Sequence, residues 1–239
     1  MLDLIRNRLR QGIRTLPFPK GPSPELPERF RGRPVRDPAR FPRDSAGLDL
    51  GACLFSPEEA AAYPAGALAY TGDFRMAVTR REALVTETGE VELARALEQR
   101  SRRLFGRSLR LRSVVAGSCG GCEAELVALG NVVFDLARFG VQFVASPRHA
   151  DGLVVTGAVN VNMRGALQQT YDAVPAPKIV LAVGACAASG GPFRGSAEVA
   201  NGLGDGLPVD LWVPGCPPHP LTILDGILRL LGTIEEGTR

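Results

Sequence analysis

The sequence predicts an α/β fold, and three observations lead to this prediction. From residue 109 onward, short continuous apolar runs alternate with segments whose apolar residues recur at helical spacing. Gly and Pro residues separate these segments, as expected of the loops of a regularly wound sheet. The chain of 239 residues is 45% hydrophobic and 22% charged, an ordinary globular composition. The alternation is typical of a doubly wound parallel sheet of the flavodoxin-like kind.

The elements of this sheet domain are expected to follow one another along residues 109–239. The expected strands are 109–115, 141–145, 153–155, 179–183 and 211–213. The expected helices are 122–139, 163–173 and 221–231. Because most of these strands are continuous apolar runs, the sheet should be covered by helices on both faces.

The first 43 residues are expected to form an extended, irregular arm without a core of its own. They contain eleven Arg and Lys against four Asp and Glu, a net charge of +7, and eight of the 19 prolines. Such an arm suits nucleic acid, acidic lipid or a partner subunit. We favour a partner and expect no nucleic-acid binding, because no folded basic domain accompanies the arm.

A short basic amphipathic helix is expected at the start of this arm. Its apolar positions recur at helical spacing and are Leu2, Ile5, Leu9, Ile13 and Leu16. Arginines surround them, so the helix suits either an anionic membrane surface or a groove of a partner. We favour the groove, because the apolar stripe is narrow and contains no Trp or Tyr.

Residues 44–98 lack strong periodicity, and a charged helix is expected over 82–104. Its apolar edge would be formed by Leu84, Leu93, Leu97 and Leu104. The chain is therefore divided into an N-terminal region, 1–108, and the sheet domain, 109–239.

Several classes of protein are excluded by composition. No uncharged apolar run approaches the roughly 18 residues of a transmembrane helix, so no transmembrane segment is predicted. Five cysteines are too few for a disulfide scaffold. The N-terminus shows neither an apolar stretch of signal-peptide length nor a twin-arginine pair. We therefore expect a cytoplasmic protein whose cysteines serve metal or redox chemistry.

Four of the five cysteines follow predicted strands. Cys119 and Cys122 follow the first expected strand, Cys186 the fourth and Cys216 the fifth. Because the carboxyl ends of parallel strands meet at one edge of a sheet, four thiols from three loops can converge on one centre. Inert buried cysteines are the simplest alternative, and the shared edge argues against it.

Four thiolates suit a structural zinc ion or a 4Fe-4S cluster. Structural zinc usually binds two CxxC pairs, whereas here one CxxC pair is followed by two distant single cysteines. Glycines crowd the four cysteines, and they allow backbone N–H groups to approach cluster sulfurs. The sequence therefore favours one 4Fe-4S cluster over zinc.

The cysteine segments resemble those of a known family. Gly117–Leu126 (GSCGGCEAEL) is similar to the small-subunit signature of NiFe hydrogenases, and Gly184–Gly191 (GACAASGG) and Val213–Pro220 (VPGCPPHP) resemble its later cysteine segments. The same segments occur in the homologous B-type subunit of complex I. The resemblance covers about residues 109–232 and implies a flavodoxin-like fold with one proximal 4Fe-4S cluster. The ligands that it implies are Cys119, Cys122, Cys186 and Cys216.

Within this family, a CxxC pair such as Cys119–Cys122 points to hydrogenases, whereas complex I subunits have adjacent cysteines. The resemblance therefore implies the membrane-bound, cytoplasm-facing group of formate hydrogenlyase, hydrogenase-4 and energy-converting hydrogenases. The partners that it implies are a large catalytic subunit, ferredoxin-type subunits and membrane subunits. It also implies a peripheral position on the inner face of the cell membrane.

The N-terminal half resembles the two-cluster ferredoxin-like subunit of these complexes, in Phe30–Pro38 (FRGRPVRDP) and Gly72–Arg81 (GDFRMAVTRR). A ferredoxin run has the form C-x2-C-x2-C-x3-C-P. The corresponding positions here are Cys53, Ser56, Glu59, Tyr63 and Pro64. Because only the first ligand and the proline remain, region 1–108 is expected to be a degenerate ferredoxin-like docking region without a cluster.

We therefore expect an electron-transfer subunit of a NiFe hydrogenase complex, with no catalytic residue of its own. The alternatives are a quinone-reducing, complex I-like module and a zinc-stabilised scaffold without redox function. Glu123 and Glu125 lie beside the cysteines, where they either relay protons or supply ordinary negative charge at a helix N-terminus. His149 and His219 are expected at the surface, with His219 near enough to Cys216 to affect a cluster.

Overall fold

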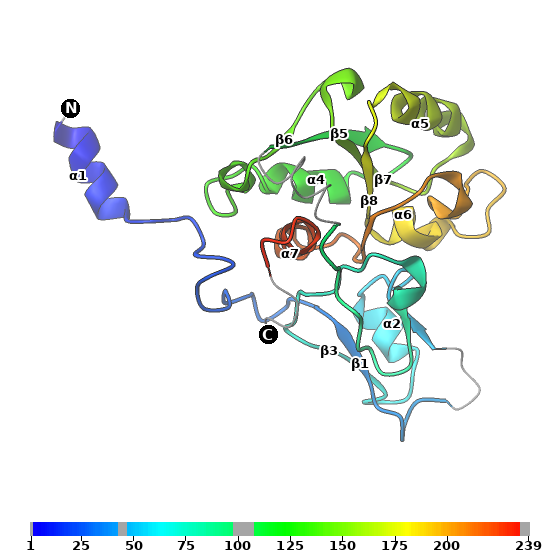
Figure 1. The fold of residues 1–239 in the computed structure, drawn as a ribbon. Helices are drawn as coiled ribbons and strands as arrows, with labels where there is room; N and C mark the ends of the chain where they lie inside the picture. The colour runs from blue at the N-terminus through cyan, green and yellow to red at the C-terminus, as the bar shows by residue number, and fades with distance from the viewer. Residues whose placement is uncertain (1, 43–46, 98–107, 235–239) are drawn as a thin grey trace.

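The centre of the molecule is a five-stranded parallel sheet, shown in Figure 1 for a computed structural model that describes residues 2–42, 47–97 and 108–234. Its strands are β5 (Leu109–Val115), β6 (Val141–Phe143), β7 (Gly152–Thr156), β8 (Ile179–Val183) and β9 (Leu211–Val213). The strand order is β6-β5-β7-β8-β9, and every neighbouring pair is parallel. This is the 2-1-3-4-5 order of flavodoxin-like folds, so the predicted fold class is confirmed.

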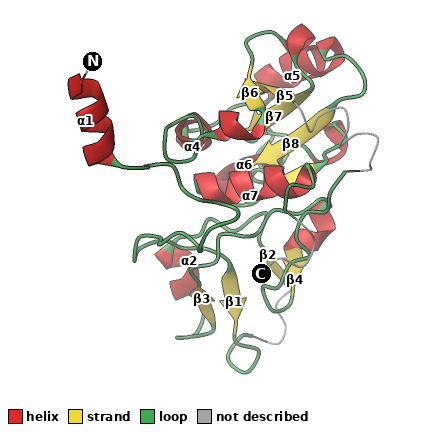
Figure 2. Ribbon diagram, turned by 60° about the vertical axis from the view of Figure 1, so that its left-hand side comes forward, coloured by secondary structure: helices red, strands yellow, loops and turns green. Residues whose placement is uncertain are grey.

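Helices cover both faces of this sheet (Figure 2). α4 (Gly121–Ala128) and α7 (Pro220–Leu230) pack on one face, whereas α5 (Val161–Ala173) and α6 (Ala185–Ser189) pack on the other. Consecutive side chains of β8 alternate between the two cores, as the pleat of a strand requires. The sheet therefore has a hydrophobic core on each face, as the apolar strands predict.

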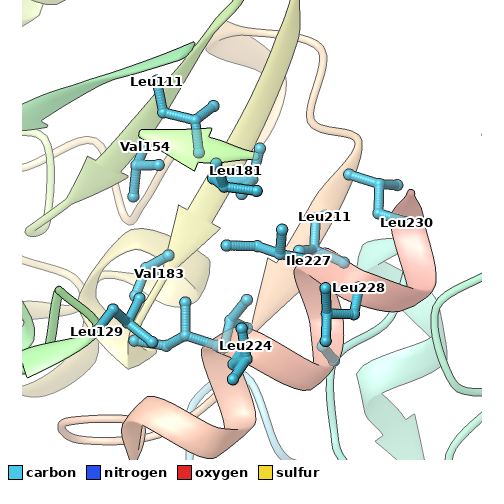
Figure 3. Close-up of a cluster of buried hydrophobic side chains, with 14 of the residues drawn as sticks. Leu111, Leu129, Val154, Leu181, Val183, Leu211, Leu224, Ile227, Leu228 and Leu230 are labelled. Atoms are coloured by element: carbon cyan, nitrogen blue, oxygen red, sulfur yellow. The ribbon is translucent and has the colours of Figure 1, made fainter. Parts of the chain in front are cut away.

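The larger side chains of the α7 face are shown in Figure 3. Leu224, Ile227 and Leu228 of α7 pack toward Leu181 and Leu211 of the sheet, and all five side chains are at most 1% exposed. Burying one such side chain stabilises a fold by about 1.5–3 kcal/mol. This face holds α7, and the loop that precedes it, firmly against the sheet.

The helix expected over 122–139 is wrong beyond Ala128, where α4 ends. Asn131 Oδ1 accepts a hydrogen bond from the Val133 N–H at 2.8 Å, which folds the chain into a turn. Only a short 3-10 helix, Leu136–Phe139, follows. Of the apolar positions at helical spacing, Leu126, Leu129 and Leu136 are buried and Val133 is half-buried, but local side-chain capping interrupts the helix.

The N-terminal half forms two small antiparallel strand pairs and a short helix. β1 (Pro34–Arg36) pairs with β3 (Leu68–Tyr70), and β2 (Leu48–Asp49) pairs with β4 (Val85–Thr86). The short helix is α2 (Pro57–Ala61). Because each strand pair is so short, the stability of this region depends on packing against the sheet domain.

The charged helix expected over 82–104 is wrong within the described residues. Arg81–Leu84 is a short 3-10 helix, β4 follows it, and residues 87–97 contain no helix or strand. The Thr86 hydroxyl accepts from the Gly89 N–H at 3.2 Å, and Gly89 has a φ of +95° that a helix cannot contain. Residues 98–104 of this expected helix lie outside the described residues.

The two halves of the chain are joined by backbone pairing as well as by side chains. Val78 and Trp212 exchange two backbone hydrogen bonds, of 3.0 and 2.8 Å, beside β9. The Leu97 N–H donates to the Leu230 carbonyl at 2.9 Å. The core between α5, α6 and the sheet also includes N-terminal residues such as Leu50 and Leu84. The N-terminal half is therefore packed against the sheet domain.

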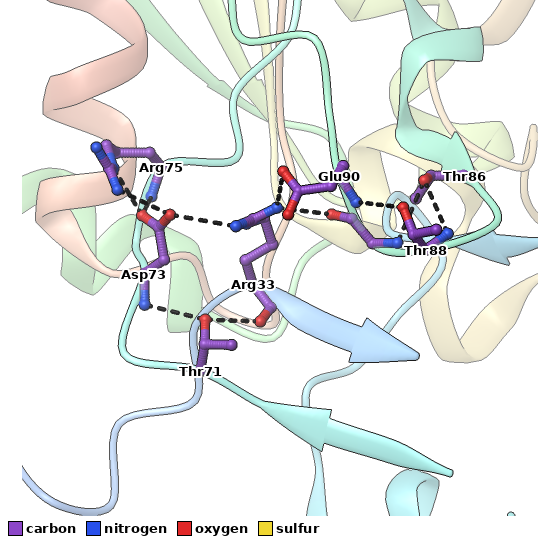
Figure 4. Close-up of polar contacts among 8 residues, drawn as sticks. Arg33, Thr71, Asp73, Arg75, Thr86, Thr88 and Glu90 are labelled. Atoms are coloured by element: carbon purple, nitrogen blue, oxygen red, sulfur yellow. Dashed lines mark hydrogen bonds and ion pairs between the residues drawn. The ribbon is translucent and has the colours of Figure 1, made fainter. Parts of the chain in front are cut away.

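A polar network holds the N-terminal half together (Figure 4). Asp73 accepts two hydrogen bonds from the Arg75 guanidinium, at 2.8 and 3.0 Å, and lies 3.6 Å from that of Arg33. Arg33 also pairs with Glu90, and its carbonyl accepts from the Thr71 hydroxyl at 2.8 Å. Arg33 thus links the start of β1 to two segments that lie far from it in sequence.

The first helix, α1 (Leu2–Gln11), has no buried residue and projects away from the rest of the molecule (Figures 1 and 2). It ends at Gln11, earlier than the expected Leu16, because Gly12 adopts a φ of +64°. Within the described ranges, no helix combines the length and the apolar character that crossing a bilayer requires.

Candidate metal centre

The four cysteines predicted as ligands all follow the carboxyl ends of strands in the parallel sheet, β5, β8 and β9. Cys119 lies between β5 and α4, and Cys122 lies in the first turn of α4. Cys186 lies in the first turn of α6 after β8, and Cys216 lies between β9 and α7. The parallel sheet therefore carries all four to one edge, where flavodoxin-like folds form their sites.

The four thiols are close enough to influence one another electrostatically. Burial raises the pKa of Cys122 to about 12, with further contributions first from the Glu123 carboxylate and then from Cys186, Cys216 and Cys119. Burial likewise raises the pKa of Cys186 to about 11, with contributions from Cys216 and Cys119. The pKa of Cys216 is also raised, first by burial and then by Cys119. Each pair among the four therefore contributes to a raised pKa, as expected of thiols whose loops share one edge of the sheet.

Glycines pack directly against two of the sulfurs. A Cβ at Gly184 would lie 2.5 Å from Cys122 Sγ, and a Cβ at Gly191 would lie 2.8 Å from Cys186 Sγ. Both glycines have positive φ values, +93° and +54°. Only glycine fits these positions, and its small size leaves the backbone next to the sulfurs.

The donor set consists of four cysteine thiols. In the part of the chain that the structure describes, no three His, Cys, Asp or Glu side chains form a group that could hold a metal ion. Four thiols that meet at one sheet edge are the donors that iron–sulfur clusters require.

Glu123 is a structural part of the cysteine loop. Its carboxylate accepts from the Ser118 hydroxyl at 2.7 Å and also from the Thr156 hydroxyl of β7. The Ser118 hydroxyl in turn accepts from the Gly120 N–H at 3.2 Å. These bonds tie the loop that carries Cys119 to the sheet. The sequence pattern does not identify Ser118 and Thr156, because their role depends on where β7 lies.

His219 is half-buried, so its expected position at the surface is wrong, whereas His149 is exposed as expected. The His219 ring makes edge contacts with Phe30 and Phe134, with centroids 5.4 and 5.9 Å away. Nδ1 accepts from the Leu221 N–H at 3.2 Å and caps α7, and burial lowers the pKa of the ring. His219 thereby fixes the start of α7, next to the loop that carries Cys216.

The ferredoxin-like ligand positions of the N-terminal half hold a hydrogen-bonded network. Glu59 Oε2 accepts from Cys53 Sγ and from the Tyr70 hydroxyl, both at 3.1 Å. The Leu54 and Phe55 N–H groups donate to the same oxygen at 2.9 and 3.0 Å. Cys53 is buried, which raises its pKa. The carboxylate therefore satisfies donors of the loop that carries Cys53.

Ser56 completes this arrangement by capping α2. Its hydroxyl accepts from the Glu59 N–H at 3.1 Å, and Ser56 with Glu59 forms an S-x-x-E pattern at the helix start. Tyr63 stacks on the Phe41 ring at a centroid distance of 4.5 Å. Each position that would carry a ferredoxin ligand is thus used for a cap, a hydrogen bond or packing.

The region that contains these cysteines is similar to known proteins. The family model described as NADH ubiquinone oxidoreductase, 20 Kd subunit, matches residues 119–230. The B subunit of NADH-quinone oxidoreductase from Heliobacterium modesticaldum is 44% identical over 48% of this chain and 66% of its own length. The probable membrane-bound hydrogenase subunit mbhJ of Pyrococcus furiosus is 43% identical over 56% of this chain and 80% of its own length.

A solved structure is similar as well. A chain of the membrane-bound sulfane sulfur reductase, an archaeal respiratory membrane complex, is 34% identical with a TM-score of 0.50. The match covers 59% of this chain and 78% of that chain. The chain spans just under two thirds of the Heliobacterium protein, and the matched part carries all four clustered cysteines. The protein therefore belongs to the family of the 20 kDa subunit of NADH-ubiquinone oxidoreductase, which includes subunits of membrane-bound hydrogenases.

Proposed function

We propose that this chain is an electron-transfer subunit that holds one 4Fe-4S cluster on Cys119, Cys122, Cys186 and Cys216. The observation that carries the proposal is the position of all four cysteines after the carboxyl ends of parallel strands, at one edge of the sheet. A bound cluster would supply one-electron redox chemistry. Soft thiolate ligands favour iron–sulfur clusters over ions that prefer oxygen ligands.

The chain's own residues prepare the position for such a group. Burial raises the pKa values of Cys122, Cys186 and Cys216, which favours their protonated forms, so ligation must release these protons. α4 begins at Gly121, between Cys119 and Cys122, so its positive N-terminal end would stabilise an anionic group held by these two cysteines. Cys119 is exposed while Cys122 is buried, so the group would lie close to the surface. A surface position suits electron transfer to a partner.

We further propose that the partner is the large catalytic subunit of a NiFe hydrogenase, in a formate hydrogenlyase or hydrogenase-4-like complex. The CxxC spacing of Cys119 and Cys122 supports the hydrogenase type. Ferredoxin-type and membrane subunits would complete the complex at the cytoplasmic face of the membrane. The main alternative is a quinone-reducing, complex I-like module, since the two curated relatives, 44% and 43% identical, do not separate the types.

The N-terminal region, 1–108, is proposed to dock partners without binding metal. The network around Glu59 supports this role, because it occupies the positions that ferredoxin ligands would need. The iron content of the purified complex should then fall by about four atoms per copy of this chain when all cysteines of the chain are replaced. About eight such atoms would show a second cluster.

Single Cys→Ala variants of the four ligands test the assignment. Each should lose the visible absorbance and the EPR signal of the cluster. All four thiols are needed as ligands, so none is left to replace the one that is removed. Cys53→Ala is the matched control: Cys53 is also buried, but the variant should keep the full signal. A protein with one zinc and no iron would support the scaffold alternative and overturn the redox function.

The partner can be tested separately from the cluster. A nickel-containing large subunit needs two CxxC pairs, and nickel should co-purify with this chain. If the co-purifying large subunit lacks these cysteines and nickel, the hydrogenase type fails. The electron-transfer role would then stand with a quinone or another acceptor.

A further inference from the structure

The helix α1 leaves large apolar side chains in water. Leu2, Ile5 and Leu9 are 82%, 51% and 79% exposed, and Ile13 just beyond the helix is 88% exposed. Figures 1 and 2 show the helix standing apart from the sheet domain at the end of an extended segment. Exposed apolar side chains gathered on one element mark an interaction surface.

The arm becomes attached to the domain only after this helix. The Leu16 N–H donates to the Val133 carbonyl at 2.9 Å, and the Phe18 carbonyl accepts from Arg138 at 2.9 Å. Phe18 also contacts the Phe74 ring at a centroid distance of 5.8 Å. The anchor at residues 16–18 therefore fixes the base of the arm, and α1 is presented beyond it.

The arrangement of side chains around α1 is that of an interfacial helix. At about 100° per residue, Leu2, Ile5 and Leu9 fall within an arc of about 60°. Arg6 and Arg8 lie on opposite flanks of this arc. Leu4 lies outside the stripe, on the side that carries Asn7 and Gln11. Guanidinium groups that flank an apolar stripe on both sides can reach phosphates while the stripe enters the acyl region.

Charge and length favour lipid over a protein groove. α1 contains Arg6, Arg8 and Arg10 against Asp3 alone, so it complements an anionic surface. The helix ends before Ile13 and Leu16, which leaves only three apolar anchors in register. A groove gains its affinity from several deeply buried anchors, whereas a lipid surface requires no matching shape. The shorter helix thus reverses the preference that the sequence suggested.

We propose that α1 binds directly to an anionic lipid surface and holds this end of the chain on the membrane. The proposal does not depend on the cluster or on the identity of the large subunit. It adds a direct lipid contact to whatever attachment the partner subunits provide.

Vesicle flotation of the full chain tests the proposal. The chain should float with vesicles of phosphatidylcholine and phosphatidylglycerol, and much less with pure phosphatidylcholine. Raising the salt concentration should weaken binding, because the attraction is largely electrostatic. The triple variant Arg6→Gln/Arg8→Gln/Arg10→Gln should bind roughly a hundredfold more weakly, at about fivefold for each arginine.

A matched control removes the same charge elsewhere. Arg110→Gln/Arg148→Gln/Arg164→Gln changes three arginines of the sheet domain and should leave vesicle binding nearly unchanged. The variant Ile5→Gln/Leu9→Gln keeps every arginine and should lose insertion while retaining weak, salt-sensitive binding. α1 has no buried residue, so none of these α1 variants should unfold the domain.

Two outcomes would overturn the proposal. In the first, the full chain fails to float with anionic vesicles, or the two triple variants lose binding equally. In the second, vesicle binding is absent and deletion of residues 2–11 releases another subunit from the purified complex. That second result would assign α1 to a protein groove.

Discussion

Replacing Gly184 with alanine tests the contact between the β8–α6 turn and the clustered thiols. Gly184 precedes α6 with φ +93° and ψ 159°, a conformation that is almost confined to glycine. A Cβ there would lie 2.5 Å from Cys122 Sγ, a separation that real Cβ atoms essentially never show. The variant therefore combines backbone strain with a clash against a proposed ligand.

The two effects can be separated in magnitude. Backbone strain of this kind costs about 1–3 kcal/mol of folding free energy. To relieve the clash, Cys122 Sγ must move by about 0.5 Å to reach even the closest tolerated separation of 3.0 Å. A displacement of about 0.5 Å is at the limit of what a ligand set for a metal site tolerates. Gly184→Ala should thus lose most of its bound iron while the protein remains folded.

Two other glycines provide controls. Gly120 has nearly the same φ, +90°, but no atom lies within 4 Å of the position that a Cβ would take, so Gly120→Ala introduces strain without a clash. Gly165 lies within α5, also with open space, and has no positive φ, so Gly165→Ala should stabilise the protein by up to about 1 kcal/mol.

The assay is iron content per chain, together with the EPR signal of the reduced protein and unfolding by urea. Gly184→Ala should lose most of its iron, Gly120→Ala should keep most of it, and Gly165→Ala should keep all of it. If Gly184→Ala and Gly120→Ala retain iron equally, the contact with Cys122 does not position the ligand and the reasoning is refuted.

The remaining predictions concern buried polar groups. Asp225→Ala removes the partner of Arg229, 2.8 Å away in an ion pair whose side chains are 1% and 5% exposed, and should cost about 3–5 kcal/mol in urea unfolding; a cost below about 1 kcal/mol would contradict this. Burial alone would raise the pKa of Asp73, but the hydrogen bonds and ion pair with Arg75 outweigh burial, and the pKa is lowered. The Asp73 carboxylate therefore stabilises the fold at pH values above its ordinary pKa of about 3.9. That contribution is lost as pH falls through the lowered pKa. Asp73→Asn should therefore destabilise the protein at neutral pH and much less in acid. A difference in unfolding free energy that does not change with pH would contradict this. Glu59→Gln keeps an oxygen that can accept from the four donors, so this variant should be tolerated. Glu59→Ala should lower the free energy of unfolding by about 2–4 kcal/mol, measured by heat or urea. Equal effects of the two variants would show that the acceptor is unimportant.

The architecture of the sheet domain could be predicted from the sequence alone. The apolar runs that predict β7, β8 and β9 are buried strands at those positions, because a strand covered on both faces needs apolar residues throughout. β5 is also a strand where it was predicted, but buried residues there alternate with more exposed ones. The position of the four cysteines at one edge also followed from the sequence, since each comes directly after a strand and all strands run in parallel.

Periodicity was less informative where side chains compete with the helical backbone. The turn at Asn131 ended α4 early, and the hydroxyl of Thr86 formed a turn where a charged helix was expected. Such local bonds depend on rotamers and on neighbouring segments, and a pattern of apolar residues does not contain them.

The contacts that surround the cysteine side chains depend on the tertiary fold. The closeness of Gly184 to Cys122, the bonds from Ser118 and Thr156 to Glu123, and the placement of His219 each join different parts of the chain. The same holds for the network around Glu59, which joins the loop of Cys53 to β3. Hydrophobic periodicity reports which residues are buried, whereas these contacts depend on which buried residues become neighbours, and chain folding alone sets that.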